Sequence, residues 1–415
     1  MLRPAPLSVL KRIALSDLRP GMYVQELCGS WMEHPFWRAQ FLLDDPADLA
    51  RLRATSIREV WIDTARGRDV DPAAAPTLSR AQADREVERT LQQAAAAPPA
   101  PVRADLAAEI ERARRVVGEA RPAVISMFNH ARLGRAVDVD GATALVDRIR
   151  GAVRSSPTAV ISVARLKQAD EYTFMHSVAV SGLMIALAQQ LGLSDDDTRE
   201  AGLAGLLHDI GKARIDNAIL NKPAALTDAE FGAMRRHPEL GHAILTQSGF
   251  AQPRVLDVVL HHHERIDGNG YPDALPADRI GTFARMGAIC DVYDAITSTR
   301  AYKPGWDPSE AVRKMAEWAP SHFDAQLFQA FVKTVGIYPV GSLVQMASGR
   351  LGVVIDQCGG SLLTPKVRVF YSTRSQLRIA PEVIDLSRPG TQDRIVGRED
   401  PARWQFPDLD TLWLP

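Results

Sequence analysis

The chain has 415 residues, which is more than one hydrophobic core usually serves, so we expect two or three domains. Hydrophobic residues make up 46% and charged residues 24% of the chain, and these values exclude wholesale disorder. With 49 basic and 50 acidic residues the net charge is −1, which excludes a global basic field that would recruit polymeric nucleic acid or anionic lipid.

The first 70 residues predict a small N-terminal domain of the α+β type. A Pro-Gly turn in residues 18–24 leads into a strand, residues 45–54 have the pattern of a short helix, and residues 59–63 that of another strand. Residues 71–105 are rich in Ala, Pro and Gln, a composition typical of a linker. Residues 81–93 within this linker leave room for a solvated helix.

The central part of the chain predicts helices. Apolar residues recur there at spacings of four and seven, the pattern of one helix face. We expect connecting helices over residues 106–156 and an all-helical domain over residues 157–336. The predicted helices of this domain lie around residues 157–168, 171–192, 196–209, 227–248, 252–264 and 281–298, with one or two more between 308 and 335.

Beyond residue 336 the apolar period changes from helical to alternating. Two apolar runs separated by a turn at residues 348–350 predict a hairpin, and the alternation over residues 366–371 predicts a third strand. Residues 337–385 are therefore predicted as a small β appendage and residues 386–415 as a C-terminal tail. The predicted fold class is mainly α, with the helical domain between an N-terminal α+β domain and this appendage.

The cysteines and the apolar runs indicate the compartment. Cys28, Cys290 and Cys358 are odd in number and far apart, which argues against a disulfide framework and fits a reducing compartment. The longest apolar stretch, residues 178–188, is too short to span a bilayer. Prolines and basic residues interrupt the N-terminal apolar residues, so no signal peptide is predicted. We therefore expect a soluble, cytoplasmic protein without a membrane partner.

The histidines are concentrated in the helical region. Six of the ten lie between residues 208 and 263, and His176 lies just upstream. His208 and Asp209 follow an apolar helix, and burying such a pair is costly unless it is paired or binds metal. Imidazole and carboxylate are ordinary ligands of first-row metals, and one carboxylate can bridge two ions that clamp a phosphate. A single histidine more often caps a helix or satisfies a core contact, but that explanation fits a cluster poorly.

Several motifs in this region resemble one family. The run His208-Asp209-Ile210-Gly211-Lys212 is similar to the His-Asp signature of HD phosphohydrolases. Residues 262–272, which end in Gly-Tyr-Pro, resemble the hallmark of the HD-GYP subfamily, and the resemblance covers about residues 157–335. Further matching segments are residues 172–177, 219–223, 237–241 and 291–303. The resemblance implies an all-helical phosphodiesterase that hydrolyses cyclic di-GMP to linear pGpG and in some members to GMP.

The resemblance also implies the residues of the site. It implies two divalent metal ions, iron or manganese. The implied ligands are His176, His208, Asp209, His237, His262, His263 and Asp291. Asp209 would bridge the ions, Lys212 would lie beside the metals and the scissile phosphate, and Tyr271 would shape the pocket near a guanine. Arg300 and Lys303, three residues apart, would hold phosphate oxygens.

The match departs from part of the family at one position. Some members place a Glu four residues before the first histidine, and this Glu recruits a third metal. Here that position is Tyr172, and Glu171 is one residue off the helical face. We therefore predict two metals. His261 and His242 have no counterpart in the motifs and are predicted to be structural or surface residues.

The role of Asp294 stays open at this point. It lies three residues after Asp291, so it could orient Lys212 or a ligand histidine, or merely pack between helices.

Two alternative functions also stay open. A sensor that binds cyclic di-GMP without cleaving it would be expected to lack a metal ligand or Lys212, and this chain retains them. An HD phosphohydrolase acting on another nucleotide would not need the Gly-Tyr-Pro segment with Arg300 and Lys303. Residues 8–66 resemble the domain of unknown function often fused ahead of HD-GYP domains, and there we expect regulation or partner contact, either in a homodimer or with a signalling protein.

Overall fold

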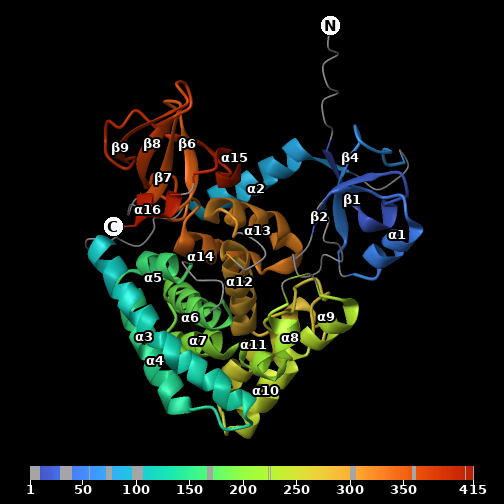
Figure 1. The fold of residues 1–415 in the computed structure, drawn as a ribbon, viewed down its shortest axis with the longest axis vertical. Coiled ribbons are helices and arrows are strands. Elements are labelled where there is room, and N and C mark those ends of the chain that lie inside the picture. The colour runs from blue at the N-terminus through green and yellow to red at the C-terminus, as the bar shows by residue number, and fades with distance from the viewer. Residues whose placement is uncertain are drawn as a thin grey trace. The chain divides into compact units, whose positions relative to one another are not determined.

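The computed structural model describes most of the chain. The described residues are 10–28, 40–55, 57–71, 77–95, 106–165, 172–222, 224, 226–299, 305–357, 361–406 and 408–414. The chain divides into two compact units, Met1–Thr90 and Leu91–Pro415, and each is described by itself (Figure 1).

The N-terminal unit is built on an antiparallel sheet. Its elements are β1 (Leu10–Ala14), β2 (Tyr23–Cys28), β3 (Phe41–Leu42), α1 (Pro46–Arg53), β4 (Glu59–Asp63) and β5 (Leu78–Ser79). The strand order is β3-β2-β4-β1-β5, so β4 lies at the centre. Val60 and Ile62 of β4 are fully buried with Leu52 of α1. The helix predicted over residues 45–54 and the strand predicted over 59–63 are confirmed.

A long helix spans the boundary between the two units. This helix, α2 (Arg80–Ala95), lies within the segment expected to be a linker. It is not solvated all round, because Ala83, Val87, Leu91 and Ala94 are buried. These residues recur at spacings of four, four and three, which places them on one helix face.

The larger unit is mainly helical. Its helices are α3 (Leu106–Arg132), α4 (Val139–Ser155), α5 (Pro157–Arg165), α6 (Tyr172–Gln190), α7 (Asp195–Leu207), the 3-10 turn η4 (Ile210–Arg214), α8 (Asn217–Leu220), α9 (Asp228–Met234), α10 (His237–Gln247), α11 (Pro253–His261), α12 (Thr282–Thr297), α13 (Pro308–His322) and α14 (Ala325–Val335). Helix α6 is apolar on every side and packs against α3, α4, α5, α7, α12 and α14. A helix of this kind forms the core of the domain. Within the described part of the chain, no helix has both the length and the apolar character needed to cross a membrane.

One predicted helix is wrong in a way that matters for the site. The helix expected over residues 227–248 is two helices, α9 and α10, which are separated at Arg235 and Arg236. Pro238 explains the break, because in a continuous helix it would have no N–H group to donate to the carbonyl of Met234 and its ring would clash with that carbonyl. His237 consequently becomes the first residue of α10.

A second sheet follows the helices. Its strands are β6 (Leu343–Met346), β7 (Arg350–Asp356), β8 (Lys366–Ser372), β9 (Leu377–Asp385) and β10 (Ile395–Arg398), in the order β10-β6-β7-β8-β9. The predicted hairpin is present as β6 and β7, and Gly349 in its turn has a φ of +76°, a conformation that favours glycine. The predicted third strand is β8.

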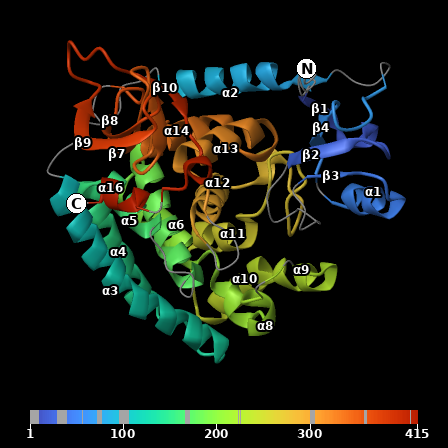
Figure 2. The ribbon, with the colours of Figure 1, turned by 45° about the horizontal axis from the view of Figure 1, so that its top comes forward.

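The residues expected as a tail belong to this sheet. Strand β10 pairs with β6, and the short helices α15 (Pro401–Trp404) and α16 (Leu409–Trp413) follow it. Helix α16 packs against β7 (Figure 2). Trp413 of α16 belongs to a buried cluster with Phe370 of β8. The fold class, mainly α with small sheets in the N- and C-terminal regions, is as predicted.

Candidate metal centre

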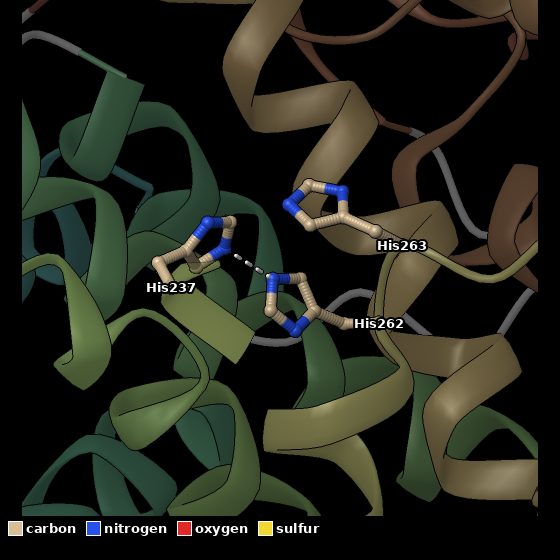
Figure 3. Close-up of side chains that lie close together, drawn as sticks. All are labelled: His237, His262 and His263. Carbon is tan, nitrogen blue, oxygen red and sulfur yellow. Dashed lines mark hydrogen bonds between the residues drawn. The ribbon is translucent and has the colours of Figure 1, made fainter. Parts of the chain in front are cut away.

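Seven histidine and aspartate side chains meet in the helical domain. These are the residues that the sequence motifs implied as metal ligands. Three groups of them have candidate ligand atoms within 4.8 Å of one another: His237, His262 and His263; His176, His208 and Asp291; and His208, Asp209 and His262. Figure 3 shows the first group, whose imidazole rings lie close together. The shared members connect all three groups into one site, which we call the metal cluster.

Helix ends position five of these seven candidate ligands, and helix interiors position the other two. His208 and Asp209 follow the end of α7, His237 begins α10, and His262 and His263 follow the end of α11. His176 and Asp291 come from the interiors of α6 and α12, respectively.

A glycine allows two of these segments to approach each other. A Cβ atom at Gly211, in η4, would overlap the carbonyl oxygen of His237. Only glycine therefore lets η4 lie this close to the start of α10. This is the physical reason for Gly211 in the motif that begins at His208, because the close approach brings Asp209 against His237.

The Asp209 carboxylate divides the histidines into two sets. Its Oδ2 lies 3.5 Å from Nε2 of His176 and 3.3 Å from Nε2 of His208. Its Oδ1 lies 3.2 Å from Nε2 of His237 and 3.8 Å from Nε2 of His262. Oδ1 is also buried without a hydrogen-bond partner in the described structure. An orphaned buried oxygen is costly, and a cation on each side of the carboxylate would satisfy it.

The histidine tautomers favour the same interpretation. Nδ1 of His208, His237 and His262 lies 2.8, 2.8 and 3.0 Å from the backbone carbonyl oxygens of residues 205, 234 and 258. A carbonyl only accepts, so each Nδ1 carries the hydrogen and each Nε2 presents a lone pair. The Nε2 atoms of His237 and His262 are only 3.2 Å apart. Facing lone pairs repel each other unless a cation lies beside them.

Burial keeps three of the imidazoles neutral. Burial, assisted by the imidazoles of His208 and His237, lowers the pKa of His262 to about 3. Burial also lowers the pKa of His237, and it lowers the pKa of His263 well below its usual value. These histidines therefore have free lone pairs near neutral pH, which metal ligation requires.

The carboxylates are held in their ionised form. Burial alone would raise the pKa of Asp209, but the charges of His208 and Lys212 outweigh it and hold this pKa well below the usual value. Burial would likewise raise the pKa of Asp291, but the hydrogen bond from His176 outweighs it. Burial alone would lower the pKa of His208, whereas the charge of Asp209 raises it. The chemistry of this donor set, in which the imidazoles of His237, His262 and His263 are neutral and the carboxylates are ionised, fits divalent cations.

Asp294 supports a ligand histidine. Its Oδ2 lies 2.6 Å from Nδ1 of His176, and Nε2 of the same ring lies 2.8 Å from Oδ1 of Asp291. The three side chains are buried. Carboxylate–histidine pairs of this kind fix the orientation of a metal ligand and raise its basicity. Of the alternatives left open by the sequence, the structure favours a contact with a ligand histidine.

Lys212 and Tyr271 border the cluster. Nζ of Lys212 lies 2.5 Å from Oδ2 of Asp209. The Tyr271 ring stacks on the His263 ring with a centroid distance of 4.6 Å and an interplanar angle of 21°, and the Tyr271 N–H donates to the His263 carbonyl at 3.2 Å. Both side chains lie beside the implied metal ligands.

A buried glutamate that sequence analysis missed holds the loop containing Tyr271. The Glu264 carboxylate accepts hydrogen bonds from the N–H groups of Asp273 at 2.7 Å and Leu275 at 3.0 Å. A Cβ at Gly270 would overlap the Cα of Glu264, so this close approach requires glycine. The position of Glu264 directly after His263 was the available signal, but its partners lie nine and eleven residues away.

Other candidate residues lie apart from the cluster or cannot be placed. His261 bonds two carboxylates, with Nδ1 2.7 Å from Asp257 and Nε2 3.1 Å from Asp273, and so has a structural partner on each side. His242 belongs to none of the three ligand groups. The residues that cannot be placed are Arg300, Lys303 and Glu171, which lie outside the described residues together with the side chain of Tyr172.

Comparisons with known proteins agree with this geometry. A family model described as a domain of unknown function (DUF3391) matches residues 10–142, and one described as an HD domain matches residues 153–327. A cyclic di-GMP phosphodiesterase of Pseudomonas aeruginosa is 54% identical over 406 residues, which cover 98% of this chain and 96% of that protein.

Other relatives match less than half of the chain. A cyclic di-GMP phosphodiesterase response regulator of Xanthomonas campestris is 38% identical over 202 residues, 46% of this chain and 52% of that protein. A 3′3′-cGAMP-specific phosphodiesterase of Vibrio cholerae is 36% identical over 164 residues, 39% of this chain and 38% of that protein. The relatives therefore include proteins named for two different cyclic dinucleotides.

Proposed function

The chain belongs to the HD-GYP family and carries a DUF3391 domain ahead of its HD domain, and from this membership we infer that it is a metal-dependent cyclic di-GMP phosphodiesterase. The observation that carries the inference is the metal cluster, in which one buried carboxylate, Asp209, faces two sets of imidazole nitrogens with its two oxygens. Such an arrangement can hold a pair of divalent cations, and two such ions together can cleave a phosphodiester.

We propose that the cluster holds two ions, iron or manganese. His176, His208 and Asp291 would hold one, while His237, His262 and His263 would hold the other, and Asp209 would serve both. Divalent cations at this place would supply Lewis-acid chemistry, polarising phosphate oxygens and lowering the pKa of water. The Asp291–Asp294 spacing lets α12 supply one ligand and the group that orients another.

The side chains around the cluster would bind and orient the substrate. Lys212, held on Asp209, would place its positive charge beside the non-bridging oxygens of the scissile phosphate, where negative charge develops. Tyr271, fixed on His263, would form a wall of the pocket near a guanine. We keep Arg300 and Lys303 as proposed phosphate-binding residues on the basis of the motif alone.

Two finer statements also stay proposals. We propose linear pGpG as the product, with further hydrolysis to GMP as a second step. We propose that residues 1–70 provide regulation or partner contact, through a homodimer or a signalling protein.

One assay tests the function. Purified protein loaded anaerobically with Fe²⁺ or Mn²⁺ is incubated with cyclic di-GMP, and the products are separated by chromatography. We expect metal-dependent formation of pGpG, which Asp209→Ala abolishes. Tight binding without cleavage would instead indicate a sensor, and faster cleavage of 3′3′-cGAMP would indicate the other substrate class found among the relatives.

A further inference from the structure

An arginine lies over the ring of the Gly-Tyr-Pro tyrosine and has no acidic partner among the described residues. Arg235 lies at the C-cap of α9 and is exposed, and its guanidinium carbon lies 4.5 Å from the centroid of the Tyr271 ring. Across the described ranges, no carboxylate forms an ion pair with it. Glu230, one turn earlier in α9, is engaged with Lys222 at 2.6 Å and with the N–H of Thr227 at 2.7 Å. The positive charge of Arg235 is therefore available to a ligand.

The aromatic rings connect Arg235 with the metal cluster. Tyr271 stacks on His263, whose ring centroid lies 5.0 Å from that of His237. The break between α9 and α10 adds a second connection, because Arg235 lies only two residues before His237. One helix junction thus supplies both a proposed metal ligand and an exposed cation.

The chemistry of a guanidinium indicates what it binds. Its N–H donors lie in its own plane and point outward, so a contact between its carbon and the Tyr271 ring leaves N–H groups for the oxygens of a phosphate. A cyclic dinucleotide carries two phosphodiesters. When one lies on the metal cluster, the other lies away from it and still carries a full negative charge.

Resting on the proposed function, we propose that Arg235 binds the second, non-scissile phosphate of the cyclic dinucleotide. Tyr271 holds the guanidinium in place, and the donor edge receives the phosphate at the rim of the site. Arg235 is thus a substrate-binding residue that contributes affinity but takes no part in metal binding or bond cleavage.

The test compares two substrates and two variants. Cyclic di-GMP has two phosphates, whereas bis(p-nitrophenyl) phosphate is a diester with only one. Arg235→Gln is compared with Arg236→Gln, a matched control at the same junction. Arg236 is also exposed, and in the regions that the structure describes its side chain makes no hydrogen bond or ion pair.

We expect Arg235→Gln to lower kcat/KM for cyclic di-GMP by about tenfold or more, mainly through KM, because a charge-assisted hydrogen bond is lost. Its turnover of bis(p-nitrophenyl) phosphate, its metal content and its Tm should stay within error of the wild type. Arg236→Gln should leave both substrates within about twofold. Cyclic di-AMP, used as a competitive inhibitor, should lose the same affinity in Arg235→Gln as cyclic di-GMP does.

Three results would overturn the proposal. An equal loss on both substrates would make Arg235 a support of Tyr271 and the metal cluster. An unchanged KM for cyclic di-GMP would remove it from substrate binding. Weaker binding of cyclic di-GMP with unchanged binding of cyclic di-AMP would assign it to a guanine base. Failure of the proposed function itself would look different, since the wild-type protein would then not cleave cyclic di-GMP, or would cleave 3′3′-cGAMP faster.

Discussion

Two buried aspartates in the larger unit show how a ligand carboxylate differs from a structural one. Asp307, the N-cap of α13, accepts hydrogen bonds from the N–H and hydroxyl groups of Ser309, from the N–H of Glu310 and from the N–H of Leu343 in β6. Asp209 is more deeply buried, yet its Oδ1 has no hydrogen-bond donor among the described residues and faces imidazole nitrogens. Protein groups donate all of these hydrogen bonds to Asp307, whereas Oδ1 of Asp209 gains a partner only when cations bind.

The two environments also shift the pKa of the aspartate in opposite directions. Burial raises the pKa of Asp307, and its hydrogen bonds only partly offset this effect. The pKa of Asp209 is held well below its usual value, because the charges of His208 and Lys212 outweigh burial. Asp307 thus stabilises the junction between α13 and the second sheet, whereas the metal cluster keeps its carboxylates ionised. Variants at the two sites should therefore fail in different ways.

The largest effect is expected at the bridging position. Asp209→Ala should abolish hydrolysis of cyclic di-GMP and lower the metal content by about one ion or more, because the carboxylate serves both proposed ions. Elemental analysis and a product assay on the same preparation measure both. Full metal occupancy with wild-type turnover would contradict the assignment.

Asp307 should respond in the opposite way. Asp307→Ala removes a helix cap and leaves the buried N–H of Leu343 without its acceptor, so we expect the free energy of unfolding to fall by about 2–4 kcal/mol. Metal content per folded chain should not change. Denaturant unfolding and elemental analysis check the two statements, and metal loss without destabilisation would remove the distinction between the two aspartates.

A smaller effect is expected where a carboxylate acts through a ligand. Asp294→Ala removes the acceptor from Nδ1 of His176 and should weaken metal affinity by about 10–100-fold. Asp294→Asn retains an acceptor oxygen and should recover part of the affinity. Competition with a chelator measures the affinity of each protein. If both variants bind metal as the wild type does and differ only in Tm, Asp294 is a packing residue.

Removal of the metal ions should lower the thermal stability of the protein. Without cations, the lone pairs of His237 and His262 face each other and Oδ1 of Asp209 stays unsatisfied, so the chelated protein should melt a few degrees lower. In Asp209→Ala the same treatment should change the Tm less. Calorimetry on the four samples makes the comparison, and a Tm that does not respond to chelation would argue against metal-linked stability.

Local motifs made most of the cluster predictable from sequence. His208 with Asp209, and His262 with His263, are adjacent in sequence, and the helix ends that carry them follow from apolar periodicity. The break before His237 was missed although Pro238 signals it, and with it the position of Arg235. The bond from Leu343 to Asp307 and the pairing of β10 with β6 could not be predicted, because they join residues 36 or more positions apart.

The most direct test of the two-metal site is the number of ions needed for turnover. Metal-free protein is titrated anaerobically with Mn²⁺ or Fe²⁺, and bound metal and pGpG formation are measured at each step. Metal occupancy should saturate at two ions per chain, and full activity should require the second ion. Activity in the metal-free protein, or full activity with one ion per chain, would contradict it.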